Sequence, residues 1–149
     1  MKISDFLAAA DVRVDIAATD KKKLLAALAR DAGVKLNIPG DRIAAELLKR
    51  EELGSTGVGG SVAIPHARFA EAKAPFGMLV RLKKAMDYEA VDGKPVDIVF
   101  LLLLPEGSGG EQQLGALATI ARKLRNPEIA AALRRARDGA EIYRTLTAD

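Results

Sequence analysis

The sequence contains no cysteine among its 149 residues, and it contains a single histidine, His66. Without cysteine, the chain cannot form a disulfide framework, a thiolate metal site or a cysteine nucleophile. A metal centre at His66 is a poor interpretation, because no second histidine or cysteine can share the ligation. We therefore expect the protein to need neither a metal nor another cofactor.

Aromatic residues and long apolar runs are also scarce. Phe, Trp and Tyr together make up 4% of the chain, which leaves no stacking platform for single-stranded nucleic acid. The longest apolar run, 98–104, is far too short to span a membrane. The N-terminal segment has a short apolar run interrupted by acids, unlike a signal peptide. We expect a cytoplasmic protein that binds no nucleic acid and inserts into no membrane.

The chain does have an ordinary globular balance, with 49% hydrophobic residues, 29% charged residues and a net charge of +3. This length and composition fit one domain over residues 1–149. The basic residues are spread along the chain, which suits a solvated helix face or an acidic protein partner.

Four segments have the patterns of strands: 12–16, 61–64, 76–82 and 96–104. The first alternates apolar and polar residues, as a half-buried strand does. The last is apolar without alternation after Asp97. Both of its faces must be covered, so we place it in the middle of a sheet between helices.

Five helices are expected, over residues 19–33, 41–52 and 111–124, and from residues 127 and 138 onward. Thr19 and Asn126 are candidate caps for two of them, and Gly33 is a candidate end for the first. The order mixes the two element types without strict βαβ repetition. It predicts a three-layer α/β sandwich, with a mixed sheet flanked by helices on both faces.

The segment GSTGVGGSVAIPHAR, residues 54–68, places four glycines ahead of the only histidine. It nearly spells a P-loop, but Gly60 stands where the phosphate-binding lysine is required, and a helix precedes it instead of a strand. A dinucleotide-binding G-x-G-x-x-G fails because Val62 occupies the last glycine position. Two interpretations stay open: a mobile glycine-rich connection, or a nest of backbone amides that binds an anion.

His66 favours the anion site, although a lone histidine is more often a surface or core residue. Pro65 stiffens the approach to it, so the imidazole is held rigidly beside the loop. No G-x-S-x-G elbow supports a serine triad. With an ordinary pKa near 6.5, a good fraction of the imidazole is neutral and nucleophilic towards phosphorus at neutral pH.

Arg50 lies just before this loop, near the end of the predicted helix 41–52. It shares helical spacing with Ile43 and Leu47, which predicts that it points inward and meets an anion. The alternative is an Arg50–Glu46 surface pair worth about 0.3–0.5 kcal/mol.

The segments KREELGSTGVGGSVAIPHAR (49–68) and AVDGKPVDIVFLLLLPE (90–106) resemble the mannitol/fructose-type IIA domains of the bacterial phosphotransferase system, above all the nitrogen-regulatory group. The resemblance covers nearly the whole chain. It implies helices around a mixed sheet of about five strands. It also implies that His66 accepts a phosphoryl group on Nε2 from the phosphohistidine of an HPr-like carrier protein. The expected phosphoryl-binding residues are Arg50, Ser55, Thr56, Gly57, Gly59 and Gln113.

Gln113 marks a departure, because the family usually carries a second histidine there. An amide can donate a hydrogen bond but cannot carry charge, which affects the expected transfer rate and not the identity of the acceptor. We also expect Gly57 and Gly59 to be needed for transfer and not for folding.

The resemblance implies a regulatory phosphocarrier that signals by its phosphorylation state, in nitrogen, potassium or carbon regulation. It would turn over no small molecule of its own, and its regulated partners would be proteins such as sensor kinases or transporters. Two alternatives stay open: a sugar-transport component that passes phosphate to a IIB domain, and a binding module whose phosphotransfer is weak or lost.

Overall fold

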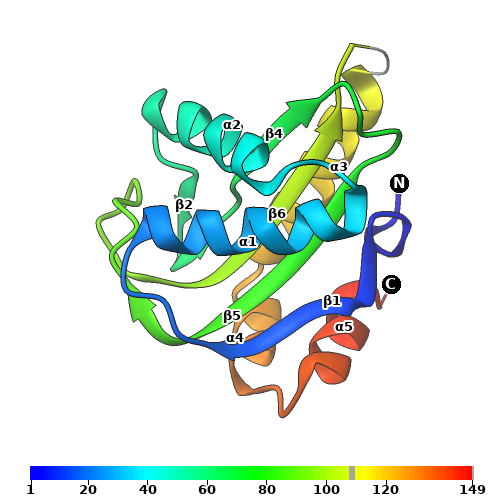
Figure 1. The fold of residues 1–149 in the computed structure, drawn as a ribbon. Helices are drawn as coiled ribbons and strands as arrows, with labels where there is room; N and C mark the ends of the chain where they lie inside the picture. The colour runs from blue at the N-terminus through cyan, green and yellow to red at the C-terminus, as the bar shows by residue number, and fades with distance from the viewer. Residues whose placement is uncertain (108–109, 149) are drawn as a thin grey trace.

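A six-stranded mixed sheet forms the centre of the protein in the computed structural model, which describes residues 1–107 and 110–148, without the side chains of 110–114 (Figure 1). The strands are β1 (Leu7–Ile16), β2 (Gly57–Gly59), β3 (Val62–Ala63), β4 (His66–Phe69), β5 (Phe76–Met86) and β6 (Val96–Pro105). The order is β1-β5-β6-β3-β2, with β4 also paired to β6. Strands β1 and β5, β3 and β6, and β4 and β6 run parallel, whereas β5 and β6, and β2 and β3, run antiparallel.

Helices cover both faces of this sheet, which confirms the predicted sandwich. They are α1 (Lys21–Leu36), α2 (Gly40–Glu52), α3 (Gly110–Arg125), α4 (Pro127–Arg135) and α5 (Gly139–Thr147), with a short 3-10 helix, η1 (Ile3–Asp5), near the N-terminus. Helices α1 and α2 share one hydrophobic cluster with the sheet, and α3, α4 and α5 share another. In Figure 1, α1 and α2 lie in front of the sheet and α3 and α4 behind it.

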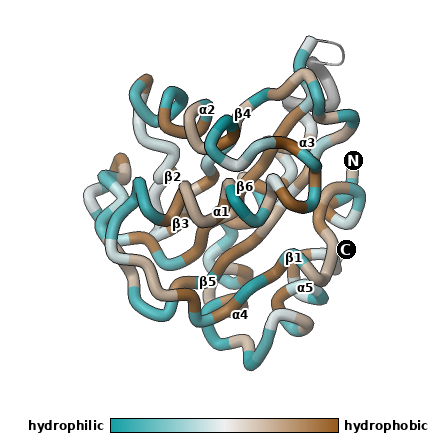
Figure 2. The backbone as a smooth tube through the Cα atoms, viewed as in Figure 1, coloured by the Kyte–Doolittle hydropathy of each residue, from teal (hydrophilic) through white to brown (hydrophobic). Residues whose placement is uncertain are grey.

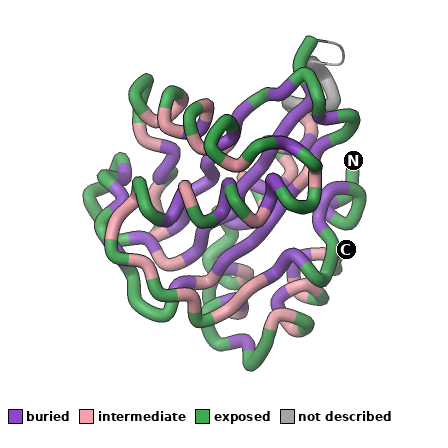
Figure 3. The backbone as a smooth tube through the Cα atoms, viewed as in Figure 1, coloured by how far each residue is buried: buried purple, intermediate pink, exposed green. Residues whose placement is uncertain are grey.

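Strand β6 is buried along almost its whole length, as its unbroken apolar sequence predicts (Figures 2 and 3). Val99, Leu101 and Leu103 face the α1/α2 cluster. Phe100 and Leu102, which alternate with them, face the cluster of α3, α4 and α5. The period of two along a strand thus divides one apolar run between two cores.

Some boundaries differ from the sequence prediction. Helix α1 is capped by the side chain of Asp20 and not by Thr19, and it continues past Gly33 to Asn37, which adopts a left-handed conformation. A Cβ atom at residue 33 would lie 2.5 Å from the carbonyl oxygen of Ile38. Gly33 therefore serves a close approach of the returning chain and does not end the helix.

The two extra strands, β2 and β4, are short segments that flank the predicted strand at 61–64. The apolar segment before His66 divides into β3 and an extended Ile64–Pro65 link, and His66 itself begins β4. The predicted cap at Asn126 is confirmed, since its side chain accepts from the amides of Glu128 and Ile129. Within the described part of the chain, no helix has the length and apolar character needed to cross a membrane.

Candidate functional site

His66 is held in place by the strand that it begins. It pairs with Leu102 of β6, and the amide of Leu102 donates to the carbonyl oxygen of Pro65 over 2.9 Å. Ile64 and Pro65 are buried, while His66 is partly exposed. The imidazole thus stands at the surface on a backbone that is fixed by the central strand.

One ring nitrogen of His66 has a partner within its own chain segment. Nδ1 lies 2.9 Å from the carbonyl oxygen of Ile64. A carbonyl oxygen can only accept a hydrogen bond, so Nδ1 carries the proton, and the lone pair of the neutral ring is on Nε2. The contact selects the tautomer in which Nε2 is the nucleophile.

The surroundings favour the neutral ring. Burial lowers the pKa of His66, and the positive charges of Arg50 and Arg68 lower it further. The hydrogen bond to Ile64 and the negative charge of Glu51 act in the opposite direction without reversing the shift. At neutral pH the imidazole is therefore mainly unprotonated on Nε2.

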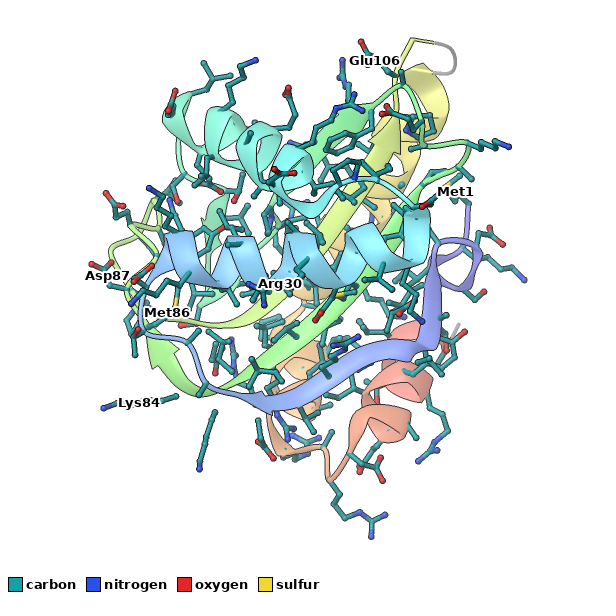
Figure 4. All side chains as sticks on the ribbon, in the orientation of Figure 1. Met1, Arg30, Lys84, Met86, Asp87 and Glu106 are labelled. Carbon is teal, nitrogen blue, oxygen red and sulfur yellow. The ribbon has the colours of Figure 1, made fainter. Side chains whose placement is uncertain are left out.

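A surface pocket of about 500 Å³ opens beside the imidazole, between α2 and β4. Its charged lining comprises Arg42, Lys49, Arg50, Arg68, Glu46 and Glu106 besides His66. Figure 4 shows Glu106 where the chain leaves β6. Two cations have acidic partners, since Arg42 pairs with Glu71, and Lys49 lies 3.7 Å from Glu46. The pocket that His66 lines is cationic overall and can accept an anion such as a phosphoryl group.

Arg50 lines this pocket together with His66. Its Nη1 donates to the carbonyl oxygen of Gly54 over 2.8 Å, and this bond holds the guanidinium over the loop that follows α2. A guanidinium has five N–H donors, so others stay available for an anion. Among the described ion pairs, Glu46 is paired with Lys49 and not with Arg50.

The hydroxyls of the glycine-rich loop are turned to internal partners. Thr56 is buried, and its hydroxyl contacts Glu51 and lies 3.0 Å from the Tyr88 hydroxyl. Ser55 Oγ accepts from the amide of Gly57 over 3.0 Å and lies 3.3 Å from the carbonyl oxygen of Tyr88. Among the described residues that line the pocket, none comes from 54–60.

Several amides of the loop likewise have acceptors within the protein. The amide of Thr56 donates to the Glu51 carboxylate over 3.0 Å, and that of Gly60 donates to Asp92 over 3.0 Å. A Cβ atom at Gly57 would lie 2.7 Å from the Cβ atom of Ala90, and Gly59 has a φ of +101°. Packing at Gly57 and the positive φ at Gly59 thus give both glycines a role in folding, which corrects the expectation that they are not needed for it; their role in transfer stays a prediction.

Comparison with known proteins identifies the family of the chain. Residues 5–149 match the family described as "Phosphoenolpyruvate-dependent sugar phosphotransferase system, EIIA 2". The chain belongs to this IIA family. It is 44% identical to the nitrogen regulatory protein of Bradyrhizobium diazoefficiens over 98% of this chain and 95% of that protein. It is 30% identical to the nitrogen regulatory protein of Escherichia coli over 99% of this chain and 90% of that protein.

Solved structures of IIA proteins agree with this assignment. The nitrogen regulatory protein IIA-Ntr of Neisseria meningitidis superposes with a TM-score of 0.92 at 32% identity, over 97% of this chain and 99% of that chain. The mannitol IIA of Escherichia coli superposes with a TM-score of 0.75 at 16% identity, over 93% of this chain and 97% of that chain, and shows the shared fold alone. The family and these relatives support a regulatory role in the phosphotransferase system.

Two further residues bear on the site: Gln113, which was predicted, and Arg68, which was not. Gln113 belongs to α3, but its side chain lies outside the described residues, so its role stays a prediction. Arg68 was absent from the predicted site although it lines the pocket. It follows His66 by two positions on β4, and residues two apart on a strand share a face; that spacing was the available signal.

Glu51 was also missed. Ile43, Leu47 and Glu51 are spaced by four residues on α2, and Ile43 and Leu47 are buried. The Glu51 side chain is only 6% exposed, so it continues this inward stripe. The predicted stripe contained the neighbouring Arg50, which lines the pocket instead.

Proposed function

We propose that this IIA protein is a regulatory phosphocarrier that accepts a phosphoryl group on Nε2 of His66 from the phosphohistidine of an HPr-like carrier protein. The observation that carries the proposal is the contact between Nδ1 and the Ile64 carbonyl oxygen. It leaves the lone pair on Nε2, beside a cationic pocket.

The transfer exchanges one phosphorus–nitrogen bond for another. The Nε2 lone pair attacks phosphorus, the bond to the donor's imidazole nitrogen breaks, and that nitrogen keeps the electron pair. No proton has to move on His66, because Nδ1–H is already bonded to Ile64. Phosphoryl transfer of this kind depends mainly on positioning and on stabilising the charge of the oxygens. Arg50 and Arg68 supply the positive charge here.

Regulation follows from the charge that the site gains. A phosphorylated side chain carries about −1.5 to −2 charges at neutral pH, here within a pocket whose lining is mainly cationic. A partner that docks over this pocket meets a more negative surface on the phosphorylated protein than on the unphosphorylated one, and this difference lets it distinguish the two forms. The similarity to nitrogen regulatory proteins along nearly the whole chain favours this output over sugar transport.

Intact-mass measurement after incubation with phosphoenolpyruvate and the upstream carrier proteins tests the proposal. We expect one added phosphate that is labile in acid and stable in alkali, and none on His66→Ala. Normal labelling of His66→Ala, with wild-type stability, would overturn the assignment. Onward transfer from the labelled protein to a IIB domain would instead make it a transport component.

A further inference from the structure

A buried charge centre lies next to the site, around the carboxylate of Glu51. Glu51 is the last residue but one before the loop that begins at Leu53, and its side chain is 6% exposed. Its partner Lys21, from the first turn of α1, is 15% exposed, and Tyr88 is buried. Met86 and Asp87, just ahead of Tyr88, lie beside the start of α1 in Figure 4. Three separate segments, the end of α2, the start of α1 and the segment around Tyr88, therefore meet at one carboxylate.

Among the described residues, every hydrogen-bond partner of this carboxylate is a donor. Oε2 accepts from Lys21 Nζ over 2.9 Å and from the amide of Thr56 over 3.0 Å. Oε1 accepts from the Tyr88 hydroxyl over 3.0 Å and from the Thr56 hydroxyl. Burial alone would raise the pKa of Glu51, but the bonds from Thr56 and Lys21 outweigh it, and the pKa is lowered. The carboxylate stays ionised, and an ionised carboxylate can only accept.

A short run of hydrogen bonds leads from this carboxylate to the imidazole. Glu51 fixes Thr56 by its amide and its hydroxyl. The carbonyl oxygen of Thr56 accepts from the amide of Ile64 over 2.9 Å. The carbonyl oxygen of Ile64 accepts from Nδ1 of His66 over 2.9 Å. The group that selects the histidine tautomer is thus anchored, through one backbone bond, to the residue that Glu51 holds.

The same carboxylate fixes the end of helix α2. Arg50 is the neighbour of Glu51, and its guanidinium bonds to Gly54 within the loop that Thr56 closes. With Glu51 tied to α1 through Lys21 and to the loop through Thr56, the last turn of α2 has little freedom to move. The carboxylate of Glu51 therefore fixes the positions of both Arg50 and His66.

We propose that Glu51 is a positioning residue for phosphoryl transfer: its ionised carboxylate holds Thr56, and thereby sets both the Nδ1–H tautomer of His66 and the placement of Arg50. This inference rests on the proposed acceptor role of His66. It assigns Lys21 and Tyr88 the task of keeping the carboxylate buried and charged. A purely structural role is the competing interpretation, since breaking a buried ion pair destabilises a protein by itself.

The test separates these roles by substituting charge without changing shape. Glu51→Gln removes the charge of the carboxylate. Lys21→Met with Glu51→Gln removes both charges of the pair, so that no unpaired lysine is left to destabilise the protein. Glu52→Gln is the matched control, because it removes the same charge from the next residue, which is exposed. The readouts are nitrogen-15 NMR of the His66 ring for tautomer and pKa, the rate of His66 labelling, and the melting temperature.

We expect both Glu51 variants to label His66 on the order of tenfold to a hundredfold more slowly than the control. The Nδ1–H tautomer should lose its dominance, and the pKa of His66 should fall, because the negative charge of Glu51 raises it. The other charged groups that line the pocket at His66 are unchanged across these variants: Arg42, Glu46, Lys49, Arg50, Arg68 and Glu106.

A folded double variant with the tautomer, pKa and labelling rate of the Glu52→Gln control would overturn the inference. A lower melting temperature with unchanged ring properties would make Glu51 structural only. If the wild-type protein itself takes no phosphate, the proposed function fails, and the NMR readouts still decide whether Glu51 sets the state of the ring.

Discussion

The Nδ1 nitrogen of His66 lies 2.9 Å from the carbonyl oxygen of Ile64, two residues earlier in the chain. Pro65 stands between them, and its ring restricts the backbone at that position. The consequence of the contact is chemical, because it determines which ring nitrogen carries a lone pair.

The rate of His66 labelling should show little dependence on this ring as pH falls from about 8 to about 6.5. Burial, with the charges of Arg50 and Arg68, lowers the pKa of His66 from 6.5, so protonation removes the lone pair only at lower pH. NMR titration of the ring in the free protein, beside the pH–rate profile, separates its titration from that of the donor. A titration midpoint at or above 6.5 would contradict the prediction.

Replacing Arg50 should slow the transfer. Arg50→Gln removes a charge from the pocket that His66 also lines, and the loss in rate should be about tenfold or more, equivalent to about 1.4 kcal/mol at the transition state. Arg30→Gln is the control, since this arginine is exposed on α1 (Figure 4). Equal labelling rates for the two variants would exclude Arg50 from the reaction.

Gly57→Ala should destabilise the fold by about 1–3 kcal/mol, the usual cost of overpacking. The new Cβ atom would lie 2.7 Å from Ala90 Cβ and 2.8 Å from its Cα atom. Gly115→Ala is the control, because a Cβ atom there meets nothing within 4 Å on α3. That change should stabilise the helix by up to about 1 kcal/mol. Urea unfolding compares the free energies of unfolding of the two variants. Equal values would mean that the backbone at Ala90 moves aside and accommodates the new methyl group.

Arg81→Met should cost about 2–3 kcal/mol of unfolding free energy. Nη1 of Arg81 donates to the carbonyl oxygens of Leu133 over 3.0 Å and Ala136 over 2.6 Å, at the end of α4. Methionine fills similar space but leaves these oxygens without their charged donor. Lys83→Met serves as the control, since Lys83 is exposed on the same strand. If Arg81→Met and Lys83→Met have the same midpoint in chemical denaturation, water replaces the hydrogen bonds that the Arg81 guanidinium donates.

Gln113→His should speed labelling of His66, most clearly below pH 7, where the new imidazole is charged. A charged donor makes a hydrogen bond roughly twice as strong as a neutral one, and residue 113 lies near the start of α3. Gln113→Ala should slow the transfer modestly. Three coincident rates across the pH range would mean that residue 113 does not contact the phosphoryl group.

Local sequence patterns correctly predicted those features of the fold that depend on adjacent residues alone, such as the burial of a strand or the start of a helix. The apolar run of β6 indicated burial on both faces, and Asn126 with Pro127 marked the start of α4. The roles of the loop residues depended on distant partners that no local pattern reveals. Gly57 packs on Ala90, and Glu51 meets Lys21 and Tyr88, all far away in sequence. A glutamate near a helix end is ordinarily solvated, so only these contacts show that this one is buried.

The alternation along β6 gives the molecule two interiors instead of one. Each is sealed by its own helices, and the backbone of the sheet is the wall between them. The pocket at His66 opens between α2 and β4, on the α1/α2 side of that wall. Ile64, whose carbonyl oxygen accepts from Nδ1 of His66, packs in the cluster behind it, among α3, α4 and α5, so the packing of the second interior also bears on the geometry of the site.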